Sequence, residues 1–268
     1  MSPAAATAAL CTPACVTRSA SRVPPPELAR RYAALSYEIG LGVAQGARLA
    51  EPHALRARAR GILGALGVRL DAGPERLTVD GAGRSPGTLI VANHISWLDV
   101  VSLLAVEPVT VLAKREVGQW PVIGALARRA GSRFIDRDGL RQLPHVVADL
   151  ASTLRSGRSV LVFPQATTWC SVSGGRFRRA TFQAAADAGA PVRPVTIRYY
   201  QHGARSTTAA FLGDETFGAS LHRVAGARGL AVRVTAHAPL HGSDRRELAA
   251  EAQAAVGAHE MSAHGEVA

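Results

Sequence analysis

Apolar residues recur at three- and four-residue spacing in the part of the chain that follows residue 26. The recurring positions are Leu28, Tyr32, Leu35, Ile39 and Val43. This spacing places them along one face of an α-helix, and Glu51-Pro52 interrupts the pattern because proline cannot continue a helix. We therefore predict a pair of amphipathic helices within residues 27–70.

Arginines populate the remaining faces of these two helices. They are Arg30, Arg31, Arg48, Arg56, Arg58 and Arg60. A basic amphipathic pair of this kind can dock on an anionic membrane surface, with its apolar stripe turned toward the lipid. The same stripe can instead pack against the main domain, and the sequence leaves both interpretations open.

Farther along the chain, short β-branched runs alternate with longer helical stretches. The runs that we predict as strands are 88–92, 109–113, 133–136, 159–163, 192–199 and 232–238. The stretches that we predict as helices are 97–106, 119–130, 140–156, 178–189 and 244–256. This alternation predicts an α/β fold, with a mostly parallel β-sheet flanked by helices.

The same patterns divide the chain into four parts. Residues 1–26 are small and polar with several prolines, which predicts a disordered leader. The helical pair follows at 27–70, the α/β domain at 71–256, and a loose tail at 257–268.

Composition narrows the class of protein. Of the 268 residues, 47% are hydrophobic, which excludes a disordered or fibrous chain. The 31 basic and 20 acidic residues give a net charge of +11, so we expect an anionic partner. No stretch offers the roughly 20 mainly apolar residues of a membrane-spanning helix, and residues 1–10 lack the features of a signal peptide.

Two anionic partners compete, a membrane surface and nucleic acid. We do not expect nucleic acid, because aromatic residues make up only 5% of the chain, no known binding motif is present and the arginines are dispersed. We expect peripheral contact with the anionic cytoplasmic face of the cell membrane instead.

The three cysteines are too few, and odd in number, for a disulfide scaffold, which indicates a reducing compartment. Cys11 and Cys15 lie in the leader with no further ligand near them in the sequence, so we predict no metal site. Cys170 follows the strand at 159–163, and we expect it to be simply a buried residue.

The segment richest in candidate chemistry is 93–99, directly after the strand at 88–92. His94 and Asp99 would point about 140° apart on a continuous helix. If His94 lies in the turn and Asp99 in the first helical turn, the two side chains can meet. Asp99 then accepts a hydrogen bond from His94 Nδ1, and Nε2 is left as a general base. The alternative is a capping aspartate beside a surface histidine.

Three later blocks place polar residues where predicted strands begin or end. In Gly131–Arg137, two arginines suit a phosphate or carboxylate group. Val160–Thr168 runs from a strand into a polar loop, and Ala190–Val195 enters a strand through two prolines. Open α/β sheets bind ligands at the carboxyl ends of their strands, so the first two blocks are candidates for a ligand site.

These four blocks, in this order and spacing, resemble the glycerolipid acyltransferases, the lysophosphatidic acid acyltransferase-like family. The resemblance covers about residues 88–200 and is strongest to the bacterial lyso-ornithine-lipid and lysophosphatidate group, partly through 175–177 and 211–215. It implies transfer of a fatty acyl group from acyl-CoA or acyl carrier protein to a lysolipid hydroxyl in membrane-lipid biosynthesis. It implies neither a metal nor another cofactor.

The resemblance also implies roles for particular residues. His94 is the base and Asp99 its orienting partner. The residues expected to bind substrate are Asn93, Ser96, Arg133, Asp136, Arg137, Pro164, Gln165, Ala166, Thr167 and Thr168.

The third block departs from the family pattern of phenylalanine, proline, glutamate, glycine and threonine. Gln165 replaces the glutamate, and an amide can donate hydrogen bonds where a carboxylate only accepts them. Ala166 replaces the glycine, which disfavours a positive φ, and Thr168 stands where an arginine is frequent. These changes leave open a catalytically weak protein of the same fold that binds lipid or acyl chains. A hydrolase that uses the same histidine and aspartate on water is a further alternative.

Overall fold

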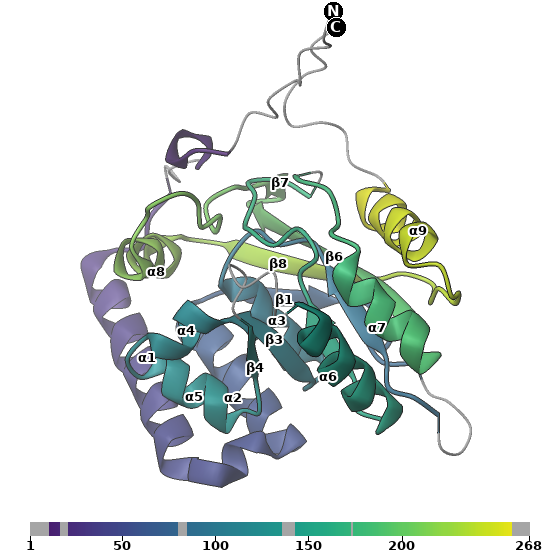
Figure 1. Ribbon diagram of the computed structural model, residues 1–268. Coiled ribbons are helices and arrows are strands. Elements are labelled where there is room, and N and C mark those ends of the chain that lie inside the picture. The colour runs from purple at the N-terminus through teal and green to yellow at the C-terminus, as the bar shows by residue number, and fades with distance from the viewer. Residues whose placement is uncertain (1–10, 17–20, 80–84, 136–142, 173, 259–268) are drawn as a thin grey trace, which may run out of the picture.

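The computed structural model describes residues 11–16, 21–79, 85–135, 143–172 and 174–258. Within them the chain forms an eight-stranded sheet in the order β1-β8-β6-β2-β5-β3-β4, with β7 paired to β6 (Figure 1). The strands are β1 Arg69–Ala72, β2 Leu89–Ala92, β3 Thr110–Lys114, β4 Arg133–Ile135, β5 Val160–Val162, β6 Val192–Gln201, β7 Ala204–Arg205 and β8 Leu230–Ala236.

The sheet is mostly parallel, as the sequence predicts. β2 lies at its centre, parallel to both β5 and β6. Antiparallel pairing occurs where β6 meets β8 and β7. All four residues of β2 are fully buried, because helices cover both faces of the sheet.

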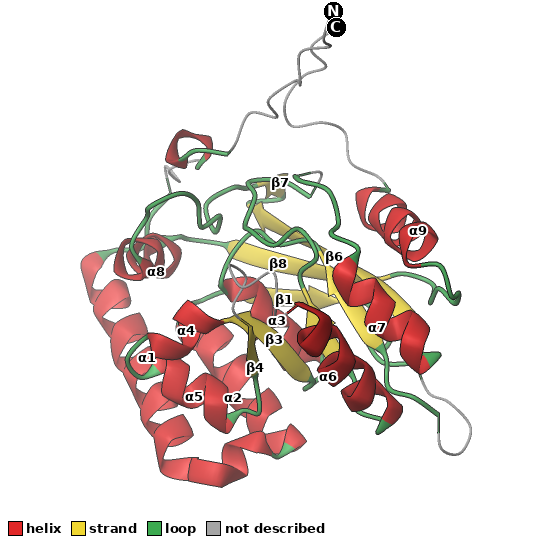
Figure 2. Ribbon diagram, in the orientation of Figure 1, coloured by secondary structure: helices red, strands yellow, loops and turns green. Residues whose placement is uncertain are grey.

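Helices flank the sheet on both sides (Figure 2). The helices are α1 Pro25–Gln45, α2 Pro52–Ala65, α3 Leu98–Val106, α4 Arg115–Gln119, α5 Ile123–Arg129, α6 Leu143–Arg155, α7 Ala180–Ala188, α8 Phe217–Gly226 and α9 Arg245–Gly257, with short 3-10 turns η1 Pro13–Cys15 and η2 Gly46–Ala50. One core cluster joins the sheet to α1, α2, α3 and α8. A second joins its other face to α6, α7 and α9.

The N-terminal helical pair packs on the main domain. Leu35 of α1 and Leu63 of α2 are buried in the core cluster that contains α3. The Arg31 guanidinium is also buried and donates to the backbone oxygens of Leu66, Ala225 and Ala227. These contacts fix α1 against the ends of α2 and α8.

Several boundaries differ from the sequence prediction. The helix expected over 119–130 is shorter: α4 ends at Gln119 and only α5 lies within this range, because Pro121 interrupts the helix and Val122 takes a positive φ of 64°. Strand β1 and helix α8 were not predicted. Part of the expected leader has a defined position, since η1 packs on the domain and Arg22 bridges to Ala227.

Candidate active site

The turn that follows β2 is fastened to the neighbouring strand. The buried side chain of Asn93 donates from Nδ2 to the Ile197 oxygen at 3.0 Å and accepts from the Ile197 nitrogen at 2.8 Å. Ile197 belongs to β6, so this amide pair takes the place of ladder bonds beyond the end of β2. The chain therefore leaves the sheet in a defined direction at His94.

His94 and Asp99 meet across this turn. His94 Nδ1 lies 2.9 Å from Asp99 Oδ2, and the aspartate is fully buried while the histidine side chain remains 18% exposed. Because an ionised carboxylate can only accept, Nδ1 carries the proton and Nε2 keeps its lone pair. This is the arrangement that a general base requires.

Asp99 is held by backbone and side-chain donors. Its Oδ2 also accepts from the backbone nitrogens of Ile95 at 2.7 Å and Ser96 at 2.8 Å, at the start of α3. Ser96 Oγ accepts from the Leu98 nitrogen and so closes the same turn. A short turn with a carboxylate five residues after the histidine is thus a local structure that the sequence spacing indicates.

The second carboxylate oxygen has a partner that the sequence analysis missed. Tyr199, on β6, donates from its hydroxyl to Asp99 Oδ1 at 2.7 Å. Burial, reinforced by the charge of Asp99, raises the pKa of Tyr199 well above its ordinary value, so the phenol stays a donor. The available signal was a tyrosine in the strand that the fourth block enters.

Phe163 and the loop after β5 close over the histidine. The rings of His94 and Phe163 stack with centroids 4.0 Å apart. The backbone nitrogen of Trp169 donates to the backbone oxygen of His94 at 2.8 Å, and that of Phe211 donates to the backbone oxygen of Ile95 at 3.0 Å. The backbone on both sides of the imidazole is therefore tied to later parts of the chain.

Gln165 shows why an amide can stand at this position. Its Oε1 accepts from the backbone nitrogen of His94 at 2.7 Å. Its Nε2 donates to the oxygens of Val172 and Gly174, within the same loop. A carboxylate could accept the first bond but could not donate the other two. The amide thus ties its own loop to the turn that holds His94.

The other expected substrate residues fall into two groups. Asn93, Ser96 and Gln165 are buried, and their hydrogen bonds described above are all to the protein's own backbone. The neighbouring loop residues are more varied: Ala166 adopts a positive φ of 63°, Thr167 is exposed, Thr168 donates to the Phe211 oxygen, and the Pro164 oxygen accepts from the Arg178 nitrogen.

Arg133 lies on the edge strand β4, where it pairs with Leu112 of β3. Its strand is separated from β2 by β3 and β5. Among the described residues, no hydrogen bond joins Arg133 to the turn that holds His94. Asp136 and Arg137, predicted to complete this block, lie outside the described residues.

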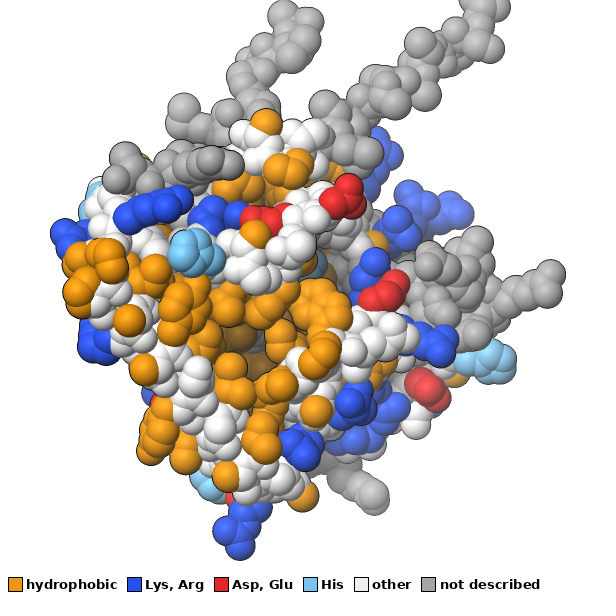
Figure 3. Space-filling view, turned by 90° about the vertical axis from the view of Figure 1, so that its left-hand side faces the viewer, with side chains coloured by type: hydrophobic (Ala, Val, Ile, Leu, Met, Phe, Trp, Pro, Cys, Tyr) orange, Lys and Arg blue, Asp and Glu red, His pale blue; other side chains and the backbone are white. Residues whose placement is uncertain are grey.

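An aromatic cluster adjoins the turn that holds His94. Phe217, at the start of α8, packs against Trp97 with ring centroids 5.1 Å apart and against Trp120 at 5.4 Å. All three side chains are partly exposed. Figure 3 shows apolar side chains gathered around a hollow on the side of the molecule that carries α1, α4, α5 and α8. Apolar surface thus continues outward from Trp97, which lies between Ser96 and Leu98.

Comparison with known proteins places this chain in a family. Residues 73–198 match the family model described as Acyltransferase. The chain is 35% identical to the 1-acyl-sn-glycerol-3-phosphate acyltransferase of Neisseria meningitidis, over 65% of this chain and 67% of that one. It is 38% identical to the lyso-ornithine lipid O-acyltransferase of Pseudomonas aeruginosa, over 68% and 71%.

A solved structure shares the fold. The 1-acyl-sn-glycerophosphate acyltransferase from Thermotoga maritima superposes with a TM-score of 0.60 at 18% identity, over 86% of this chain and 92% of that one. The chain belongs to the acyltransferase family, and it is an acyltransferase. No helix in the described residues has the length and apolar character needed to cross a membrane.

Proposed function

We propose that this enzyme transfers a fatty acyl group from acyl-CoA or acyl carrier protein to the hydroxyl of a lysolipid. Lysophosphatidate and lyso-ornithine lipid are the acceptors that its relatives' names suggest. The observation that carries the proposal is the pairing of His94 Nδ1 with a buried Asp99, which leaves Nε2 available for the acceptor. The thioester is a co-substrate, and the scheme assigns no resident cofactor.

In the proposed reaction, His94 Nε2 removes the proton from the acceptor hydroxyl as its oxygen attacks the thioester carbonyl. The tetrahedral intermediate then expels the thiolate, which receives the proton from the imidazolium. One ester bond forms and one thioester bond breaks. Asp99 stays ionised throughout and stabilises the imidazolium, while Tyr199 and the backbone donors hold Asp99 in place.

Acceptor binding is proposed for the loops at the carboxyl ends of β4 and β5. Arg133, Asp136 and Arg137, with Thr167 and Thr168, supply charged and hydroxyl groups for an anionic or zwitterionic headgroup. Asn93, Ser96 and Gln165 act in this scheme by holding the turn. The partly exposed cluster of Trp97, Trp120 and Phe217 offers an apolar surface for acyl chains.

Cysteine catalysis is the less favourable alternative for this site. Burial raises the pKa of the Cys170 thiol to about 12, so the group is protonated at neutral pH. A protonated thiol is a poor nucleophile. The proposed reaction therefore proceeds by direct transfer, without an acyl-enzyme intermediate.

The test is release of free thiol from acyl-CoA and acyl carrier protein thioesters, with and without a panel of lysolipids. We expect release to depend on an acceptor, and replacement of His94 by alanine to lower turnover by about 10²–10⁴-fold, the usual contribution of general-base catalysis. His145→Ala, which removes an exposed histidine on α6, is the control that leaves the base in place.

Each other outcome identifies an alternative. Thiol release without any acceptor would indicate a thioesterase. Lipid binding without release would indicate a binding protein of acyltransferase fold. Full activity in a folded His94→Ala variant would contradict the base assigned here.

We further propose that the enzyme acts at the cytoplasmic face of the cell membrane as a peripheral protein. Tyr37 and Val43 of α1 are 65% and 44% exposed, although α1 is otherwise packed on the domain. Val122, between α4 and α5, is 49% exposed. Exposed apolar side chains beside arginines suit an anionic lipid surface.

A further inference from the structure

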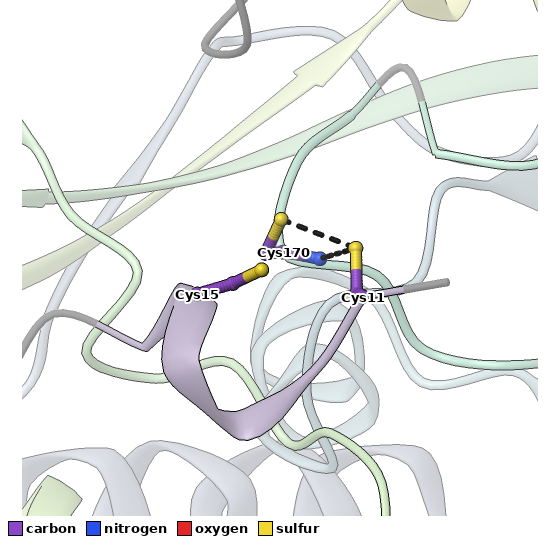
Figure 4. Close-up of side chains that lie close together, drawn as sticks. All are labelled: Cys11, Cys15 and Cys170. Carbon is purple, nitrogen blue, oxygen red and sulfur yellow. Dashed lines mark hydrogen bonds between the residues drawn. The ribbon is translucent and has the colours of Figure 1, made fainter. Parts of the chain in front are cut away.

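Folding brings all three cysteines together. Cys11 precedes the short turn η1, Cys15 is its last residue, and Cys170 lies on the loop after β5 (Figure 4). The Cys11 and Cys170 sulfurs are 3.2 Å apart, and all three sulfurs lie within 4.8 Å of one another. No further ligand lies near the two leader cysteines in the sequence, but folding brings Cys170 to them from 159 residues away along the chain.

The segment that carries two of these sulfurs is docked by further contacts. Thr207 Oγ1 donates to the Cys15 oxygen at 2.8 Å, and the Cys170 nitrogen lies 3.4 Å from Cys11 Sγ. Val16 packs on the core cluster that joins α1, α2, α3 and α8. The sulfurs are thus presented by segments with defined positions on both sides.

The spacing of the sulfurs suits a tetrahedral thiophilic cation. A zinc–sulfur bond of about 2.3 Å places neighbouring sulfurs of a tetrahedral site about 3.8 Å apart. The observed cluster needs shifts of about 1 Å or less to reach that spacing. In an iron–sulfur cluster the cysteine sulfurs are held apart by a whole inorganic core, so these sulfurs are too close for one.

The donor set indicates the same class of metal. In the described residues the cluster consists of three sulfurs and includes no imidazole or carboxylate. Residues 1–20 contain no histidine, aspartate or glutamate. Pure sulfur ligation favours zinc over magnesium or calcium, which prefer oxygen.

We propose that Cys11, Cys15 and Cys170 form a zinc-binding site that fastens the N-terminal segment to the loop after β5, with solvent supplying the fourth ligand. Cys11 and Cys15 are half-buried and Cys170 is buried, so the site has an open side for that ligand. The proposal is independent of acyl transfer, because no step of the reaction uses these sulfurs.

Zinc here would brace the loop that supports the histidine. Cys170 directly follows Trp169, whose nitrogen donates to the His94 oxygen. In the same loop, the Gln165 amide bonds to Val172 and Gly174 and to the backbone of His94. A metal at Cys170 therefore restrains the loop at a second point.

The experiment is titration of the full-length chain, purified in the presence of reductant and stripped of metal, with zinc ion against a chromophoric chelator. We expect one zinc ion per chain, and weakening of at least about tenfold in Cys11→Ser and in Cys15→Ser. Both residues lie in a short segment outside the sheet, so these variants keep the fold. Val16→Ala is the matched control, since it weakens docking of the segment without removing a sulfur.

Two further measurements make the outcome decisive. Cobalt(II) should give thiolate-to-metal charge-transfer absorption that is lost in Cys170→Ser, and zinc should slow amide hydrogen exchange in residues 164–177. The proposal is overturned if zinc binds the serine variants as tightly as the Val16→Ala control. It is also overturned if the reduced chain binds no zinc and protein prepared without reductant contains a disulfide among these cysteines.

Discussion

At the scale of single residues, the site is governed by how completely Asp99 is satisfied. Three hydrogen bonds reach its Oδ2 and one, from Tyr199, reaches its Oδ1. A buried carboxylate is stable only when such partners replace water. The orientation of the His94 imidazole thus depends on Asp99, which does not contact the substrate in our proposed scheme.

Replacing Tyr199 with phenylalanine removes one of these donors and keeps the ring. Hydrogen bonds to charged groups contribute about 1.5–3 kcal/mol, so we expect the free energy of unfolding to fall by about that amount. Turnover should fall as well, because Asp99 loses a restraint. Chemical denaturation and the thiol-release assay measure the two effects.

Tyr200→Phe is the control for this substitution, because Tyr200 is partly exposed and its ring lies beneath Arg233. We expect it to change neither quantity appreciably. Equal stability and activity in Tyr199→Phe and the wild type would show that Asp99 does not need the phenol.

Ala166 carries backbone strain. Its φ of 63° is in the left-handed region, which costs a non-glycine residue about 1–2 kcal/mol. Ala166→Gly removes this cost but adds about 0.4–1 kcal/mol of unfolded-chain entropy. We expect a net gain in the free energy of unfolding of about 0.5–1 kcal/mol, measured by denaturant titration.

A glycine in ordinary helical backbone should have the opposite effect. Ala186→Gly, within α7, is the control and should lose about 0.5–1 kcal/mol. If Ala166→Gly also lost stability, the positive φ would not be a source of strain at this position.

At the scale of elements, α1 has two distinct surfaces. Its inner face holds Leu35 in the core, while Tyr37 and Val43 point into solvent. We expect Tyr37→Ser combined with Val43→Ser to weaken co-sedimentation with anionic vesicles, because less apolar surface enters the lipid. Both side chains are exposed, so the free energy of unfolding should change by less than about 1 kcal/mol.

Leu143→Ser provides the matched control on the opposite side of the sheet. Leu143 begins α6 and is 38% exposed, close to the value for Val43. Equal loss of vesicle binding in this control and in the α1 variant would remove α1 from the docking surface.

At the scale of the whole molecule, the net charge of +11 predicts salt-sensitive membrane association. Raising the salt concentration from about 0.1 M to about 1 M shortens the Debye length from about 10 Å to about 3 Å. We expect the fraction bound to anionic vesicles to fall over this range, and neutral vesicles to bind weakly throughout. Preferential binding to duplex DNA would instead assign the charge to nucleic acid.

The sequence predicted those features whose causes are local. Strand β2 is a short apolar run, and the meeting of His94 with Asp99 follows from a local turn, since the two residues are only five positions apart. Pro121 was a visible signal for the break between α4 and α5, and Thr216 was one for the start of α8, which it caps. Both signals are short-range and were overlooked.

Other features depend on contacts that no local pattern contains. Tyr199 reaches Asp99 from 100 residues away. Cys170 joins Cys11 across 159 residues. The two donor bonds of Gln165 exist only because its loop folds back on itself. Such partners become visible once the order of strands in the sheet is known, since that order decides which loops adjoin.

The hydrogen bonds around His94 also set an order of events during synthesis. The backbone of His94 is bonded to Gln165 and Trp169. Its partner Asp99 is bonded to Tyr199. The preceding Asn93 is bonded to Ile197 and the following Ile95 to Phe211. A nascent chain that ends before these residues has the imidazole but none of these supports. The ribosome must therefore deliver most of the polypeptide before the turn that holds His94 has all of its supports.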